Sequence, residues 1–262
     1  WVEGLGSASD DHSMEGYFWS TSQKGVVATS DGGVIISGDV CMNRDWFEGC
    51  EFRFSPDSEP ITGSDGFVAK YAPNGSFDWY ELIGGAGTDY VQSTIALDDD
   101  RVLVAGNHYS FNFSVGDLYV QNSGSSDAWW AIFNHTSMEW EGLWDSDDTH
   151  DSYIHSAAAG PDGGYVLGGS SCWSTTPCMT EISGLEFPGE SYGLGWAMMV
   201  SPDGSGEWID GVASTTRGDS HVNEIVMNEH GDIMMALKAC SSEEDNDRDC
   251  MFSMLGNELG PL

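Results

Sequence analysis

Residues 65–109 read DGFVAKYAPNGSFDWYELIGGAGTDYVQSTIALDDDRVLVAGNHY, and this stretch decides the fold. Apolar runs alternate with turn-forming residues, which predicts strands at 66–72, 76–83, 91–97 and 101–109. The pair Asn74-Gly75 predicts a hairpin turn with positive φ at both central residues. Residues 98–100, all aspartate, predict a second turn. Four short antiparallel strands in succession are the plan of one blade of a β-propeller.

The same pattern recurs four times along the chain. Each copy has a tryptophan, a Gly/Ser/Thr/Asp-rich stretch and an apolar run; the tryptophans are Trp1, Trp79, Trp140 and Trp208, and the runs begin at Val34, Val102, Tyr165 and Ile233, spaced by 68, 63 and 68 residues. Regular spacing of this length predicts a repeat architecture. We expect one all-β, β-propeller-like domain of four antiparallel four-stranded blades, with repeats at 1–64, 65–126, 127–194 and 195–262. The four tryptophans are expected at matching core positions.

The two ends of the sequence are complementary in phase. Asp65 lies 14 residues before Trp79, and counting from Asp249 through Leu262 onto Trp1 gives the same interval. This predicts that the last strand completes the first repeat, either within the chain or in a neighbouring copy. Both arrangements would remove exposed strand edges, which favour aggregation. The predicted assembly strand consists of Cys250, Met251, Phe252, Ser253, Met254 and Leu255, and it would pair with the strand that follows Trp1.

The charge balance is strongly acidic, with 43 Asp and Glu against 8 Lys and Arg, a formal net charge of −35. This charge makes nucleic acid and anionic membranes unfavourable partners. No stretch has the length of apolar sequence that membrane insertion needs. A solvated acidic surface adapted to a marine or halophilic exterior explains the charge. A surface that collects divalent cations is the compatible alternative.

Six cysteines fall in three close pairs, which predicts disulfides Cys41–Cys50, Cys172–Cys178 and Cys240–Cys250. Disulfides place the protein outside the reducing cytosol, so we expect an extracellular or cell-surface location. Three N-x-S/T sequons, at Asn74, Asn112 and Asn134, are consistent with a secreted glycoprotein.

One stretch carries a family resemblance. Asp65-Gly66-Phe67-Val68-Ala69-Lys70-Tyr71, followed by Gly75, Trp79, Gly84-Gly85, Asp89, Ile95 and Gly106, resembles the SBBP ("seven-bladed β-propeller") repeat of secreted bacterial and archaeal surface proteins. Trp130-Ala131-Ile132 and Ala197-Met198-Met199 depart from the Val-Ala-Lys part of this pattern. The resemblance implies an extracellular, propeller-like, mostly non-enzymatic scaffold. It implies no set of catalytic residues.

Candidate sites for chemistry are few. Asp89, Asp151 and Asp219 share one repeat position, where a carboxylate is expected to accept backbone N–H groups in a turn, with calcium binding as the alternative. The densest acidic patch, with Asp145, Asp147, Asp148 and Asp151, is the best calcium candidate. Trp46 and Trp173 are candidates for stacking on sugars. No G-x-S-x-G, H-E-x-x-H or P-loop motif occurs, so we expect no enzymatic activity and no cofactor apart from calcium.

These observations favour a structural or adhesive surface protein, such as a surface-layer or filament subunit that assembles by strand pairing between its terminal repeats. Its expected partners are copies of itself or other surface proteins. The alternative is a monomeric propeller that binds glycan or calcium through its loops. An enzyme acting on polysaccharide is a more distant third.

Overall fold

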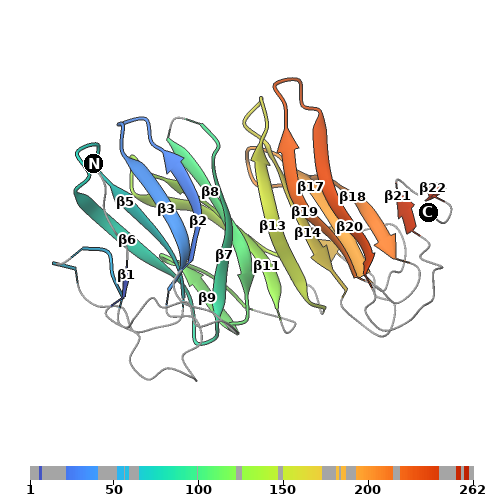
Figure 1. Cartoon of the computed structure of the whole chain (residues 1–262), viewed down its shortest axis with the longest axis horizontal. Coiled ribbons are helices and arrows are strands. Elements are labelled where there is room, and N and C mark those ends of the chain that lie inside the picture. Colours follow the sequence, from blue (N-terminus) through green and yellow to red (C-terminus); the bar gives the residue numbers. More distant parts are fainter. Residues whose placement is uncertain are drawn as a thin grey trace. The chain divides into compact units, whose positions relative to one another are not determined.

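The computed structural model describes fourteen segments of the chain. They are residues 6–7, 22–40, 52–55, 57–58, 65–98, 100–121, 126–146, 150–172, 181–182, 184–186, 193–214, 219–241, 252–254 and 257–259. Within these segments the regular elements are β-strands and none is a helix, so the predicted all-β class is confirmed (Figure 1). Accordingly, none of the described elements is a long apolar helix of the kind that spans a membrane.

The strands of the repeats follow the predicted pattern closely. The first strands of the repeats are β5 (Asp65–Tyr71), β11 (Asp127–Asn134) and β17 (Gly193–Val200), and the second are β6 (Phe77–Gly84), β12 (Glu139–Asp145) and β18 (Gly206–Ser214). The third are β2 (Ser22–Ala28), β7 (Asp89–Ala96), β13 (Ser152–Ala159) and β19 (Asp219–Met227). The fourth are β3 (Val34–Val40), β8 (Arg101–His108), β14 (Tyr165–Ser171) and β20 (Ile233–Ser241), which contain the four apolar runs.

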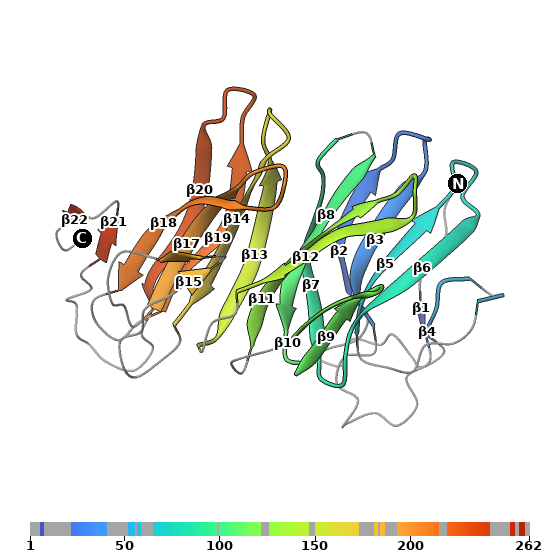
Figure 2. The same ribbon diagram turned by 180° about the vertical axis from the view of Figure 1, so that it is seen from behind.

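Shorter strands lie in the sequence between repeats. They are β1 (Gly6–Ser7), β4 (Phe52–Arg53), β9 (Asn112–Val115), β10 (Leu118–Gln121), β15 (Glu181–Ile182), β16 (Leu185–Glu186), β21 (Phe252–Met254) and β22 (Asn257–Leu259). The pairs β1–β4 and β15–β16 form two-stranded sheets of their own. Figure 2 shows the hairpin β9–β10, whose first strand continues the sheet beyond β6.

One repeat does not supply one sheet, which corrects the blade plan drawn from residues 65–109. In the first three repeats, the third and fourth strands share a sheet with the first and second strands of the next repeat. The resulting orders are β10-β9-β6-β5-β3-β2, β12-β11-β8-β7 and β13-β14-β17-β18-β21-β22. In the first sheet β3 pairs with β5 over seven residues, from Val34 opposite Tyr71 to Val40 opposite Asp65. The sheets are therefore offset from the sequence repeats by half a repeat.

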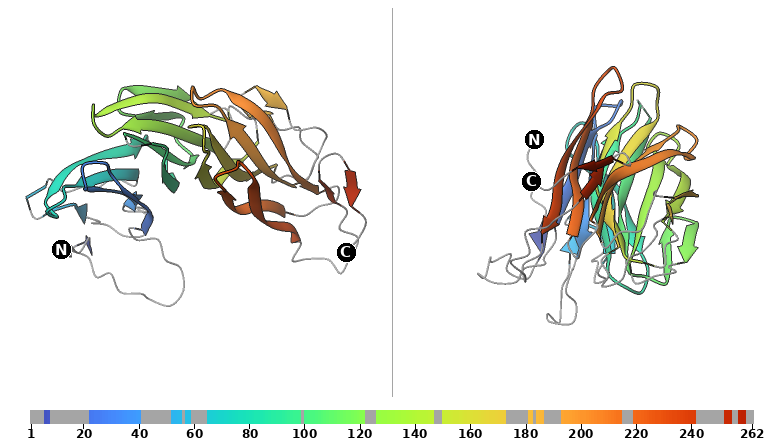
Figure 3. Two further views of the ribbon diagram at one scale, coloured as in Figure 1. Left: turned by 90° about the horizontal axis from the view of Figure 1, so that it is seen from above. Right: turned by 90° about the vertical axis from the view of Figure 1, so that its right-hand side faces the viewer.

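The chain divides into two compact units. One contains residues Trp1–Val104, His108–Gln121 and Ala131–Leu143, and the other contains Ala105–Asn107, Asn122–Trp130 and Trp144–Leu262. In the second unit the hairpin β19–β20 forms a separate two-stranded sheet that packs, mainly through β19, on the sheet containing β13, β14 and β17 (Figure 3).

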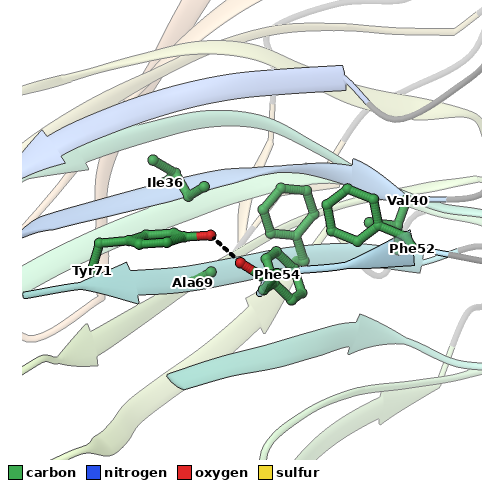
Figure 4. Packing of buried hydrophobic residues seen from close by; sticks show 7 residues of the cluster. Ile36, Val40, Phe52, Phe54, Ala69 and Tyr71 are labelled. Atoms are coloured by element: carbon green, nitrogen blue, oxygen red, sulfur yellow. Dashed lines mark hydrogen bonds between the residues drawn. The ribbon is translucent and has the colours of Figure 1, made fainter. Parts of the chain in front are cut away.

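Aromatic side chains fill the core of the first unit. Phe52, Phe54 and Phe67 are fully buried and their rings contact one another, with centroid distances of 4.9–6.1 Å. The hydroxyl of Tyr71 donates a 2.7 Å hydrogen bond to the carbonyl of Phe54, so the side-chain hydroxyl within this cluster is satisfied (Figure 4). This cluster fixes the short strand β4 and the residues after it against β3 and β5.

Five hairpin turns share one geometry. In each, the N–H of the first residue bonds the carbonyl four residues later, and the glycine three residues on has a φ of 82–88°; the glycines are Gly32, Gly75, Gly163, Gly204 and Gly231. The prediction of positive φ at both Asn74 and Gly75 is wrong, because only Gly75 adopts it. Pro73 fixes a negative φ at the start of that turn, which leaves the left-handed conformation to the glycine alone.

Candidate functional site

Asp89 is a structural link rather than an open ligand. Its buried carboxylate accepts the N–H groups of Gly85, Tyr109 and Ser110 at 2.8, 3.0 and 3.1 Å, and the Ser110 hydroxyl at 2.6 Å. Asp89 thus joins the loop after β6 to the end of β8, and the predicted role in accepting backbone N–H groups is confirmed at this position. The side chain of Asp219 lies outside the described residues.

The predicted calcium patch is described only in part. Asp145 ends β12 and Asp151 precedes β13, whereas Asp147 and Asp148 lie outside the described residues. Burial raises the pKa of Asp151, against the opposing effects of a hydrogen bond with the Ser126 backbone and of His150 nearby. The carbonyl of Asp151 also accepts the N–H of Cys172 at 3.2 Å. Calcium binding here stays a prediction.

Of the cysteines, only Cys172 has a described side chain, and it is fully buried and disulfide-bonded. The other predicted pairings, Cys41–Cys50 and Cys240–Cys250, stay predictions, as does Cys178 as the partner of Cys172. The sequon asparagines lie on β-turns or strands: Asn74 and Asn134 accept backbone N–H groups two residues on, and Asn112 begins β9. Glycosylation is likewise a prediction.

The repeat tryptophans are not the core residues that the sequence predicted. Trp79 and Trp140 are half-buried and Trp208 is exposed, and all three lie on the second strands of their repeats, β6, β12 and β18. The fully buried tryptophans are Trp129, Trp130 and Trp196, on the first strands β11 and β17. Trp1 and the sugar-stacking candidates Trp46 and Trp173 lie outside the described residues.

The predicted assembly strand, Cys250 to Leu255, is described at Phe252–Met254, which forms β21. This strand pairs with β18, with Val212 opposite Met254. The strand β9 pairs with β6 in the equivalent register, with Ile83 opposite Val115. Both strands continue into a hairpin with a two-residue turn, to β22 and to β10. Residues 1–5, the predicted partner, lie outside the described residues, so pairing between the two segments stays a prediction.

A sequence signal for the placement of β21 exists that the repeat phase does not contain. Phe252-Ser253 is identical to Phe113-Ser114, the next residues Met254 and Val115 are both apolar, and each triplet is followed after two residues by the return strand of a hairpin. The phase count from Asp249 compared the segment with β5 instead. Local sequence similarity therefore favours an outer hairpin at this position.

The most distinctive surface lies on β20. Its counterparts β3, β8 and β14 each have a strand on both sides, whereas among the described strands β20 pairs only with β19. Met234 is 68% exposed, while the residues at the same position, Ile35, Leu103 and Val166, are at most 1% exposed. Met235 and Leu237 are also exposed, at 37% and 39%. The fourth repeat thus presents a strand edge and apolar side chains that the other repeats bury.

Comparison with protein-family models gives no match for this sequence, and comparison with curated proteins gives none either.

Proposed function

We propose that this chain is an extracellular structural or adhesive repeat protein, a surface-layer or filament subunit that assembles through strand pairing at its terminal repeats. The observation that carries the proposal is the exposed edge of β20, since unpaired apolar strand edges add strands from other chains. Net charge, paired cysteines and sequons support a saline exterior as its location.

The proposal includes a finer architecture. The four repeats form propeller-type blades of the SBBP kind, each built from halves of two successive repeats. Its support is the strand order of the three larger sheets. In each of them the fourth strand of one repeat pairs with the first strand of the next repeat. In this architecture β19 and β20 are the first half of a blade, and the second half comes from a strand pair like β5–β6.

In the version that the sequence suggests, the segment Cys250–Leu255 of one copy pairs with the strand following Trp1 of another. A chain truncated after Asp249 then loses the ability to form polymers. The matched control is the substitution Phe252→Ala, which keeps the chain length and removes only a side chain.

Absolute mass by light scattering on a sizing column, in salt near that of seawater, tests the proposed function. Species heavier than the chain mass of 28.3 kDa are expected. A single compact particle of that mass at every salt and protein concentration would overturn assembly as the function. Polymers that persist in the truncated chain would overturn the C-terminal strand as the contact while leaving assembly in place.

A further inference from the structure

The edge of β20 has an unusual composition for this chain. The nine residues Ile233–Ser241 contain no acidic residue and no proline, and Lys238 is their only charge. The chain as a whole carries 43 acidic residues. Charged side chains, above all lysine, and prolines are usual means of protecting an edge strand from pairing. At this strand such protection is reduced to a single lysine.

The hydrogen-bonding phase of β20 can be read from its turn. The carbonyl of Asp232 accepts the N–H of Asn228 at 3.0 Å, so the backbone of Asp232 faces β19. In an antiparallel ladder the residues face alternate sides. Met234 and Ala236, which lie opposite Val226 and Glu224, therefore face β19 as well. The backbone groups of Ile233, Met235 and Leu237 face the other edge of β20, where none of the described strands pairs with it.

An antiparallel pairing of β20 with β20 of a second copy satisfies these groups symmetrically. With Met235 on the two-fold axis, Met235 bonds Met235 of the other copy, and Ile233 bonds Leu237. The residue pairs that lie between the hydrogen-bonded pairs have the shorter Cα–Cα distance across the two strands. In this register Lys238 lies opposite Asp232 of the second copy, and Met234 lies opposite Ala236. The charge pair of Lys238 and Asp232 is attractive, and it occurs twice because the contact is isologous.

We propose that the edge of β20 is a self-association site, at which two copies of the chain join their β19–β20 hairpins into one four-stranded antiparallel sheet. This proposal rests on the proposed function, because both require copies of the chain to assemble. The contact differs: it is formed by β20 and not by the segment Cys250–Leu255. The charge complementarity of Lys238 and Asp232 and the exposed methionines Met234 and Met235 select a second copy as the occupant.

The contact makes a prediction about salt. Two copies with a net charge of −35 each repel one another at low ionic strength. Screening within ~10 Å at 0.1 M salt weakens that long-range repulsion, while the hydrogen bonds and apolar contacts of the edge persist. Dimers are therefore expected to strengthen as salt rises.

A charge exchange tests the register. Lys238→Asp and Asp232→Lys each place like charges opposite one another twice in a homodimer, so each variant alone should dimerise about ten- to a hundredfold more weakly. An equimolar mixture of the two variants restores both attractive pairs and should form heterodimers. Sedimentation velocity with one variant fluorescently labelled measures all three samples. Glu229→Lys is the matched control, because it makes the same charge change in the same turn, away from Lys238 in this register.

A second measurement does not depend on charge variants. Hydrogen exchange by NMR should show the amides of Ile233, Met235 and Leu237 protected in concentrated protein and exposed on dilution. Recovery of dimers in the mixture, with this concentration dependence, supports the site. Assembly that is indifferent to the exchange of Lys238 and Asp232 overturns the inference and leaves the proposed function standing. Monomers throughout, with the three amides protected at every concentration, overturn both, because the edge is then covered from within the chain.

Discussion

Left-handed glycines mark five hairpin turns of this molecule, and the turn between β11 and β12 has a left-handed methionine instead. Between β11 and β12 the N–H of Met138 bonds the carbonyl of Asn134, and Met138 itself has a φ of 63°. Its side chain is 48% exposed, so packing offers little compensation for this conformation. A residue with a Cβ is disfavoured there by roughly 1–2 kcal/mol relative to the right-handed region.

The substitution Met138→Gly should therefore stabilise the fold by about 0.5–1 kcal/mol, because glycine adopts positive φ without the Cβ penalty. Urea unfolding would show a higher midpoint at an unchanged slope. The reverse change at an equivalent turn, Gly75→Ala, is the control and should lower the midpoint. Equal midpoints for Met138→Gly and the parent chain would contradict the assignment of strain to this residue.

An ion pair between a buried lysine and an exposed aspartate explains the lysine in the Val-Ala-Lys pattern. Lys70 on β5 is buried and donates to Asp31 at 2.6 Å, in the turn between β2 and β3. Hydrogen bonds from Lys70, Thr29 and Gly33 hold the pKa of Asp31 well below its usual range. The lysine thus connects the first strand of one repeat to the turn of the preceding repeat, which follows from the half-repeat offset of the sheets.

At the scale of elements, β13 and β19 meet through two histidines. The rings of His155 and His221 lie 5.6 Å apart, and His155 hydrogen-bonds the Ser170 hydroxyl at 2.8 Å, with Tyr153 stacked on its other side. Burial, together with His221, lowers the pKa of His155 to about 4. The contact between these strands therefore favours a neutral imidazole.

Acid should loosen this contact. The unfolded imidazole takes up a proton near pH 6.5, whereas the folded one does so only near its pKa of about 4. Stability from this group is therefore complete above pH 6.5 and is lost as the pH falls toward 4, by up to about 3 kcal/mol. His155→Gln should flatten the difference in unfolding free energy between pH 7 and pH 4.5. The exposed His230→Gln is the control and should leave the slope of the parent chain unchanged.

The sequence predicted individual strands well and their partners poorly. The strands predicted at 66–72, 76–83, 91–97 and 101–109 differ from β5 to β8 by at most two residues at either end. Alternation of apolar residues and turn glycines is local information, so it is readable in one copy. Strand pairing is not local information. The strand β5 pairs with β6 of its own repeat and also with β3 of the preceding repeat. Four similar repeats leave the sheet membership ambiguous to sequence alone.

The candidate site was predictable only in kind. The repeat pattern predicted an assembly strand at residues 250–255, which stays a prediction, and it did not indicate the edge of β20. The reason is that exposure of Met234 and Met235 is a difference between equivalent positions in space. Their sequence neighbours, Ile233-Met234-Met235-Ala236-Leu237, are as apolar as those of the buried strands. The buried tryptophans were missed for the same reason.

At the scale of the whole molecule, the acidic charge works against compactness. With 43 acidic and only 8 basic residues, the excess acidic groups repel one another more strongly in the folded chain than in the expanded one. Salt screens this repulsion. The melting temperature should therefore rise steadily between 0.05 and 1 M NaCl. Sucrose at matched osmolality is the control for general solvent effects. A melting temperature that is flat in salt would mean that the acids are already neutralised in the folded state.

The half-repeat offset also decides how the molecule responds to a nick. A protease that cuts once between β3 and β5, within residues 41–64, leaves fragments joined by the seven residue pairs of β3 and β5. A cut at residues 85–88, between β6 and β7, leaves only the two pairs of β6 and β9 bridging it in that sheet. The chain passes from one repeat to the next within a sheet, and it passes from one sheet to the next within a repeat. A molecule nicked between its repeats would stay joined by strand pairing, and one nicked between β6 and β7 would be held mainly by side-chain packing, such as that of β7 on β2, β3 and β5.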